Sequence, residues 1–172
     1  MKVTNEQVAK LIEQYLQTAR KCQTVFDRSW EDMLVHKLRR ENYEGYSQPA
    51  SQRWKDTVGN IMAELQQCST FEELYKRICS INVYGIGELT KYDTATCIGC
   101  PLKIYPEYVY LHAGAKIGAV AIGIIGAKVE KRIFVEKFPA FEILEPIQIE
   151  DFLCIYKDQL DGKIDSIARS CR

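Results

Sequence analysis

The pattern Gly85-Ile86-Gly87 is the part of this sequence whose residue types and spacing best suit the binding of an anion. Glycines allow close approach of the backbone and unusual dihedral angles, and Ile86 is expected to anchor the bend in the core. The bend leads into the N-terminus of a helix, where unpaired N–H groups and the positive end of the helix dipole attract negative charge. The sequence therefore predicts that the amides of Gly85, Ile86 and Gly87, aided by Lys91 in that helix, hold a phosphate.

Two helices frame this bend. Thr70 and Glu73 have the spacing of a capping box and open a helix over residues 71–79, and a second helix is expected from residue 88 to about residue 98. The order helix, short hairpin, Gly-apolar-Gly, helix resembles the helix-hairpin-helix motif of DNA-binding proteins. The resemblance covers about residues 71–98 and implies contact with the DNA backbone without reading of its sequence.

The charges around the motif keep another interpretation open. Residues 70–110 carry four basic and five acidic side chains, and Glu88 lies at the helix end where a phosphate would bind. Helix-hairpin-helix units also serve as packing elements and as surfaces for protein interaction. The alternative is therefore a protein-interaction module, or a binder of small molecules, that uses the hairpin only as a scaffold.

The order of elements after the hairpin is similar to that of the helix-hairpin-helix superfamily of DNA glycosylases. In that family a catalytic lysine, where present, lies two residues after the second glycine of the hairpin; here that position is Leu89, so a Schiff-base lyase would lack its nucleophile. The family's catalytic aspartate lies about eighteen residues further on, and an ungapped count reaches Glu107. Glu107 is thus the candidate catalytic residue of a hydrolase, which ranks as the third function. A glutamate in the first turn of a helix is also ordinary dipole chemistry.

A second group of polar residues could form a pocket for a nucleotide or a phosphate. A helix is expected from Pro106 to about residue 119, and on it Tyr108, His112 and Lys116 would share one face at i, i+4 and i+8. Tyr92 and Asp93 on the second hairpin helix are expected to pack nearby. A histidine that is hydrogen-bonded in the core is the ordinary alternative for His112.

The seven cysteines predict no cofactor and no metal site. The pair Cys97 and Cys100 forms one C-x-x-C without a partner pair, and the four-cysteine array of the iron–sulfur glycosylases is missing. The N-terminal sequence lacks the apolar core of a signal peptide, so reduced thiols in a cytoplasmic protein are expected.

The composition favours one globular domain. With 172 residues, of which 47% are hydrophobic and 27% charged, the chain can build a core, and its formal net charge is zero. The longest apolar run, residues 117–127, is too short to span a bilayer, so no membrane association is expected. The fold class predicted is all-α, a single helical domain over residues 1–172.

Several other elements follow from capping residues and apolar spacing. Thr4 with Gln7, Ser29 with Asp32, Ser51, and Pro146 are expected to open helices, and residues 41–51 read as a loop. Small residues recur every four positions between residues 114 and 127, which predicts tight internal packing. Residues 129–138 show no clear period.

The leading function is a nucleic-acid-associated helix-hairpin-helix protein, similar in fold to DNA glycosylases and lacking their lyase lysine. The expected partner is DNA, bound through its backbone without sequence specificity, and the sequence names no protein partner. It assigns no enzymatic activity. The stretches G-I-G-E-L-T-x-Y-D-T-A and V-Y-L-H-A-G also look like those of a bacterial family of uncharacterised proteins, which adds no function.

Overall fold

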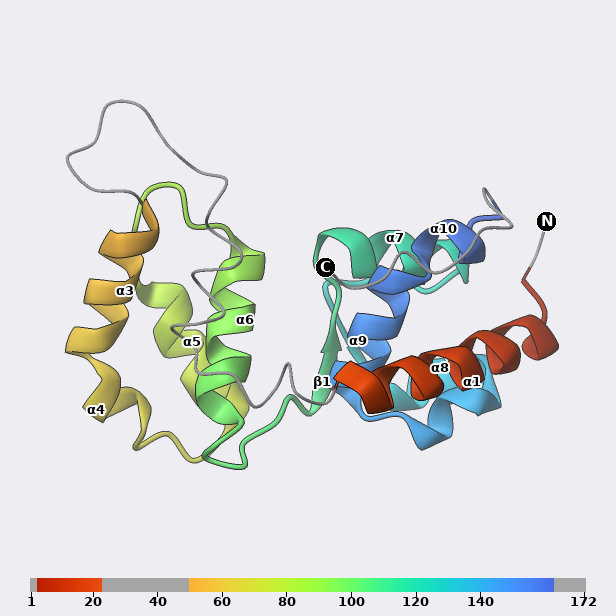
Figure 1. Ribbon diagram of the computed structural model, residues 1–172, viewed down its shortest axis with the longest axis horizontal. Coiled ribbons are helices and arrows are strands. Elements are labelled where there is room, and N and C mark those ends of the chain that lie inside the picture. The colour runs from red at the N-terminus through yellow and green to blue at the C-terminus, as the bar shows by residue number, and fades with distance from the viewer. Residues whose placement is uncertain (1–2, 23–49, 163–172) are drawn as a thin grey trace. The chain divides into compact units, whose positions relative to one another are not determined.

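The computed structural model describes residues 3–22 and 50–162, and most of these residues are helical (Figure 1). The predicted fold class is thus confirmed in its coarse form. Two short strands pair with each other within the described ranges. Among the described helices, none combines the length and apolar character that a membrane span needs.

The chain divides into two compact units, which are described separately. One unit holds residues 22–106, and the other joins residues 1–21 to residues 107–172. A single domain can consist of two such units, so the prediction of one domain stays a prediction.

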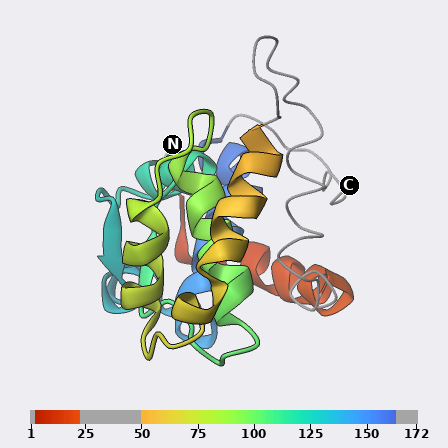
Figure 2. The same cartoon turned by 90° about the vertical axis from the view of Figure 1, so that its left-hand side faces the viewer.

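The described part of the 22–106 unit consists of helices and their connections. They are α3 (Ala50–Asn60), the single turn α4 (Met62–Leu65), α5 (Phe71–Ser80) and α6 (Glu88–Gly99). Trp54 of α3 is fully buried, and its indole Nε1 donates a hydrogen bond to Thr94 Oγ1 of α6 at 3.0 Å. The Thr94 hydroxyl in turn donates to the Thr90 carbonyl at 2.7 Å, so the buried polar pair is fully used. Figure 2 shows α3, α5 and α6 with the connection that joins α5 to α6.

The predicted start of α5 is confirmed. The Thr70 side chain accepts a hydrogen bond from the Glu73 amide at 3.2 Å, and the Glu73 carboxylate accepts one from the Ser69 amide. These bonds satisfy donors that a helix N-terminus otherwise leaves open. The Ser69 and Arg77 bonds hold the pKa of Glu73 below its usual value.

The other unit contains α1 (Asn5–Cys22), β1 (Tyr108–Tyr110), α7 (Ala113–Ala121), β2 (Lys128–Glu130), α8 (Lys131–Lys137), the 3₁₀ turn η2 (Pro139–Ile143), α9 (Pro146–Ile155) and α10 (Lys157–Leu160). One apolar core joins them. Phe134, Phe141 and Phe152 are fully buried in it, and the Phe141 ring meets each of the other two edge-on. Val8 and Ile12 of α1 belong to the same core, so the N-terminal helix is held by the C-terminal half of the chain.

The predicted openings of α1 and α9 are also confirmed. The Thr4 amide donates to Gln7 Oε1 and the Gln7 amide donates to Thr4 Oγ1, at 2.9 and 3.2 Å. Pro146 is in the first turn of α9, which a capping box of Glu145 and Gln148 precedes. The helix expected after Ser29 lies outside the described residues. So does the loop expected over residues 41–51, except for residues 50–51, which are helical and not loop. The third helix begins at Ala50, one residue before Ser51.

The helix expected from Pro106 to residue 119 is wrong in its first half. Residues 108–110 form β1, which pairs antiparallel with β2 so that Val109 lies opposite Val129, and helix α7 begins only at Ala113. Tyrosine and valine favour a pleated strand when a partner strand is available. Here residues 128–130 provide that partner.

The small residues of α7 pack closely, as predicted. A Cβ atom built on Gly118 would overlap the Leu153 carbonyl of α9, and one on Gly114 would lie 2.6 Å from Cys154 Sγ. Glycine therefore lets α7 approach α9 closely. The helix ends by Ile122, and Gly123 follows with a φ of +73°, so the glycine-rich segment after it is not helical.

Candidate functional site

A tight, solvent-exposed turn joins α5 to α6. The Ile86 amide donates to the Val83 carbonyl at 3.2 Å, which closes a β-turn over residues 83–86. Gly85 is the third residue of this turn and has a φ of +88°, as a type II turn requires. A Cβ atom at Gly85 would also lie 3.1 Å from Ala50 Cβ. Both the dihedral angle and the close approach therefore explain a glycine here.

Two of the three amides predicted to hold a phosphate have no acceptor. Within the described ranges, the N–H groups of Gly85 and Gly87 donate to no protein atom, and both residues are exposed. The Ile86 amide differs, because it is used inside the turn and Ile86 is half-buried. Gly87 is the N-cap of α6 and supplies no side chain to cap it. The open donors are thus the two glycine amides and the first-turn amides of Leu89 and Thr90 behind them.

Lys91 lies in α6, as expected, and its ammonium group contacts the end of the preceding helix. Its Nζ donates to the carbonyl oxygens of Cys79 and Ile81, at 3.0 and 2.8 Å. These carbonyls lie at the C-terminal end of α5, which a positive charge stabilises. Two of the three ammonium donors are therefore used within the protein, and a role of Lys91 at a phosphate stays a prediction.

The sequence analysis missed two residues at this site: Tyr84, which is in the turn, and Arg53 of α3, which contacts it. Arg53 of α3 approaches the Tyr84 carbonyl with Nη2 at 3.4 Å, while the Tyr84 side chain is 65% exposed. Figures 1 and 2 both show the turn beside the N-terminal end of α3. Tyr84 directly precedes the first glycine in the sequence, so its place at the turn could have been predicted. Nothing local could indicate Arg53, because it precedes Tyr84 by 31 residues.

The five residues of the predicted pocket lie in two different units. Tyr92 and Asp93 are in α6, whereas Tyr108, His112 and Lys116 are in the other unit. Tyr92 is 2% exposed and meets the rings of Phe71 and Tyr75 edge-on, which makes it part of an aromatic core cluster. Burial raises the pKa of Tyr75 above its usual range, and a hydrogen bond with Cys79 adds to this. Proximity of all five residues stays a prediction.

Tyr108 and His112 share a face for a different reason from the one predicted. Together with Tyr110 they occupy every second position along β1 and its extension, and the Tyr110 ring stacks on His112 with 6.1 Å between centroids. Lys128 of β2 holds its Nζ 4.1 Å from the Tyr108 centroid and 5.7 Å from the Tyr110 centroid. These are cation–π contacts that stabilise the pairing of β1 with β2. Lys116 lies on α7, exposed to solvent, and is not in the strand.

Glu107 directly precedes β1 and is exposed. The prediction that it opens a helix is wrong, so the helix dipole does not act on it. A role in catalysis stays a prediction.

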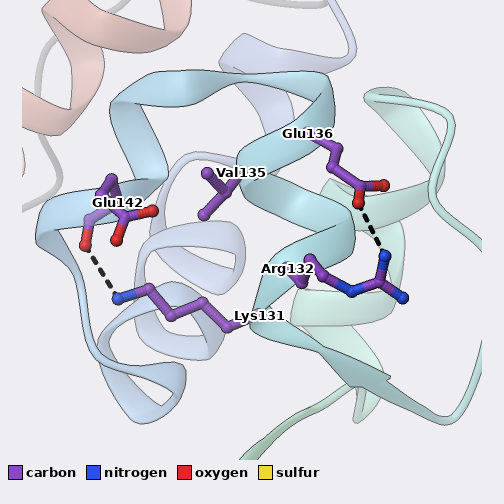
Figure 3. A pocket seen from close by; sticks show the side chains of 5 residues that line it. All are labelled: Lys131, Arg132, Val135, Glu136 and Glu142. Atoms are coloured by element: carbon purple, nitrogen blue, oxygen red, sulfur yellow. Dashed lines mark hydrogen bonds and ion pairs between the residues drawn. The ribbon is translucent and has the colours of Figure 1, made fainter.

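Figure 3 shows a shallow hollow on the 107–172 unit. Both of its basic side chains make contacts within the protein. Arg132 pairs with Glu136 at 2.8 Å, and Lys131 Nζ donates to the Glu142 carbonyl at 2.8 Å. The Arg132 charge is therefore balanced by Glu136, and one of the three donors of Lys131 is used by the backbone. Among the described residues, no group of three or more histidine, cysteine or acidic side chains is placed to hold a metal ion.

No protein-family model, curated protein or solved structure matches this chain.

Proposed function

We propose that this chain is a nucleic-acid-associated protein and that α5, the turn and α6 act as a helix-hairpin-helix unit that holds a backbone phosphate. One observation carries the proposal: the turn is exposed, and its Gly85 and Gly87 amides have no acceptor among the residues that the structure describes. Amides at a helix N-terminus bind phosphate oxygens without reading base edges. The proposed contact is therefore independent of the base sequence of the DNA. We place the protein in the cytoplasm.

The charge around the turn keeps this contact weak. Glu88 is exposed in the first turn of α6, and Lys91 is engaged at the end of α5. Arg53 is the cationic side chain that the described structure places on the turn itself. One guanidinium can neutralise one phosphate, and the uncharged amides can only donate hydrogen bonds, whereas affinity for nucleic acid depends on how many phosphates are neutralised.

The hydrolase remains the third function. Leu89 occupies the position of the lyase lysine, so the proposal includes no Schiff-base step. If Glu107 were a catalytic acid or base, Glu107→Gln would abolish base release from damaged DNA; unchanged base release would exclude it.

A protein-interaction module is the second candidate, and an apolar surface favours it. Ile117 and Val120 of α7 and Ile125 in the following turn are 50%, 52% and 84% exposed. Between residues 113 and 127, Lys116 is the single charged residue. Ile117 and Val120 are neighbours on one face of α7, at i and i+3, and neighbouring exposed apolar side chains often mark surfaces for protein contact.

The substitution Gly87→Asp tests the phosphate site without disturbing the fold. Gly87 has the extended conformation of an N-cap, with φ −87° and ψ 172°, and a Cβ built there meets no atom within 4 Å. Aspartate is a good N-cap, so its carboxylate would accept from the amides of α6 and stabilise the helix by about a few tenths of a kcal/mol. The same carboxylate would occupy the phosphate site and repel the ligand. We expect affinity for DNA to fall about tenfold or more, measured by fluorescence anisotropy with labelled single-stranded and duplex DNA.

The control is Gly59→Asp, which adds the same charge to α3 of the same unit, also in open space. It should leave DNA affinity unchanged. Binding of Gly87→Asp equal to wild type, or no binding of either DNA form by the wild type, would refute the phosphate site.

A further inference from the structure

Two cysteines share the accessible side of the last turns of α6. Cys97 lies in the helix, and Cys100 is its C-cap, with the helical dihedral angles φ −55° and ψ −54°. Both residues are half-buried, whereas their neighbours Thr96, Ile98 and Gly99 are buried. Residues three positions apart on a helix lie on the same face. The spacing C-x-x-C therefore places two thiols next to each other on the side of α6 that solvent reaches.

The backbone geometry of these two positions suits a disulfide. In a helix, Cα atoms three residues apart are separated by about 5 Å, which lies within the range of about 4.4–6.8 Å found in disulfides. The Cβ atoms of such residues are about 5–6 Å apart, whereas a disulfide needs about 3.5–4.5 Å. Formation of the bond between Cys97 and Cys100 thus requires the two Cβ atoms to approach by about 1–2 Å.

The end of α6 can accommodate this approach. The Cys100 amide donates to the Thr96 carbonyl at 3.0 Å, but the next residue is Pro101, which has no N–H to donate to the Cys97 carbonyl. The helical hydrogen bonds therefore stop at Cys100, and helix ends fray more readily than helix centres. A thiol is also only a weak donor, so other contacts of the two sulfur atoms do not prevent the reaction.

We propose that Cys97 and Cys100 are a redox-active pair, which a low-molecular-weight disulfide of the glutathione type oxidises to an internal disulfide. One cysteine attacks the oxidant as a thiolate and forms a mixed disulfide, and the first thiol of the oxidant leaves. The other cysteine attacks the protein sulfur atom of the mixed disulfide, and the second thiol leaves. The protein loses two protons and two electrons, which the two released thiols carry. Excess thiol reverses both steps, so the pair is reduced wherever thiols predominate, as in the cytoplasm.

Peptide mapping of the full-length protein tests this. The reduced protein is incubated with glutathione disulfide and glutathione, its remaining thiols are alkylated, and its tryptic peptides are analysed by mass spectrometry. Trypsin cuts after Lys91 and Lys103, so residues 92–103 form one peptide that contains these two cysteines and no other. We expect this peptide to be lighter by two hydrogen atoms and to carry no alkyl group. The internal disulfide should exceed mixed disulfides with glutathione about tenfold or more, because the second thiol is already in place.

Cys97→Ser and Cys100→Ser are the matched variants, since each leaves one thiol of the pair and should stop at the mixed disulfide with glutathione. Cys79 shows how a single thiol reacts under the same conditions, because it is exposed and its tryptic peptide, residues 78–91, contains no second cysteine. Two alkylated thiols in the wild-type 92–103 peptide, glutathione as its main adduct, or a disulfide from either cysteine to another part of the chain would overturn the proposal.

Discussion

Lys91 of α6 donates a hydrogen bond to the carbonyl oxygen of Ile81, 2.8 Å away, and a second one to Cys79. Ile81 is the C-cap of α5, so the lysine of one helix closes the end of the preceding helix. This contact joins the end of α5 to the first turns of α6, and so it connects the two helices that flank the turn of the candidate site. The shape of the turn depends on this contact, whether or not a ligand is bound.

Lys91→Met should destabilise the protein. The variant keeps most of the side chain's length and removes the charge-assisted hydrogen bonds to two carbonyls, one of which is partly buried. We expect a loss of about 1–2 kcal/mol in the free energy of unfolding, measured by urea denaturation and circular dichroism. Lys76→Met, at an exposed position of α5, should change it by less than about 0.5 kcal/mol. Equal stabilities of the two variants would show that the capping contact contributes nothing.

Thr94→Val should destabilise the protein strongly, although it changes the shape of the side chain very little. Valine has nearly the same shape but leaves the buried Trp54 Nε1 without its acceptor. An unsatisfied buried donor costs about 1–3 kcal/mol, which urea denaturation would measure. The comparison is Thr57→Val, where the lost hydroxyl binds only the Arg53 carbonyl of its own helix. A loss in Thr94→Val no larger than in Thr57→Val would contradict the importance of the indole bond.

Gly118→Ala tests the close packing of α7 on α9. The added methyl group would overlap the backbone of Leu153, which cannot turn aside as a flexible side chain would. We expect a loss of about 1–3 kcal/mol and a lower melting temperature by circular dichroism. Gly59→Ala makes the same change in α3 with no atom within 4 Å, and it should gain up to about 1 kcal/mol from helix propensity. A stabilised Gly118→Ala would mean that the helices can separate at little cost.

The elements that the sequence predicted correctly are those defined by local signals. Thr70, Thr4 and Pro146 open helices because capping involves residues only three positions apart. The same is true of the turn glycine at Gly85, whose positive φ follows from the turn itself.

The errors concern contacts between distant segments. Residues 108–110 are a strand because residues 128–130 pair with them, and no spacing within residues 106–119 reveals that partner. The role predicted for Lys91 at a phosphate stays a prediction, but the sequence did not reveal that its ammonium group binds two carbonyls at the end of the preceding helix. Arg53 reaches the turn only through the packing of α3. In the candidate site, the backbone was therefore predictable and the side chains around it were not.

Tyr15 should make the stability of the protein depend on alkaline pH. Its hydroxyl donates to Asp151 Oδ2 at 3.0 Å, and burial, followed by the charge of Asp151, raises its pKa well above the usual range. The pKa in the unfolded chain is about 10, so the folded state holds the proton more tightly. This contribution is fully present below about pH 10 and is lost as the pH rises above it, because the unfolded chain then gives up its proton first. In urea denaturation across about pH 8 to 11, Tyr15→Phe should lose stability less steeply than the wild type. Tyr105→Phe, which removes the hydroxyl of an exposed tyrosine, should follow the wild-type curve; parallel curves for all three proteins would rule out the Tyr15 effect.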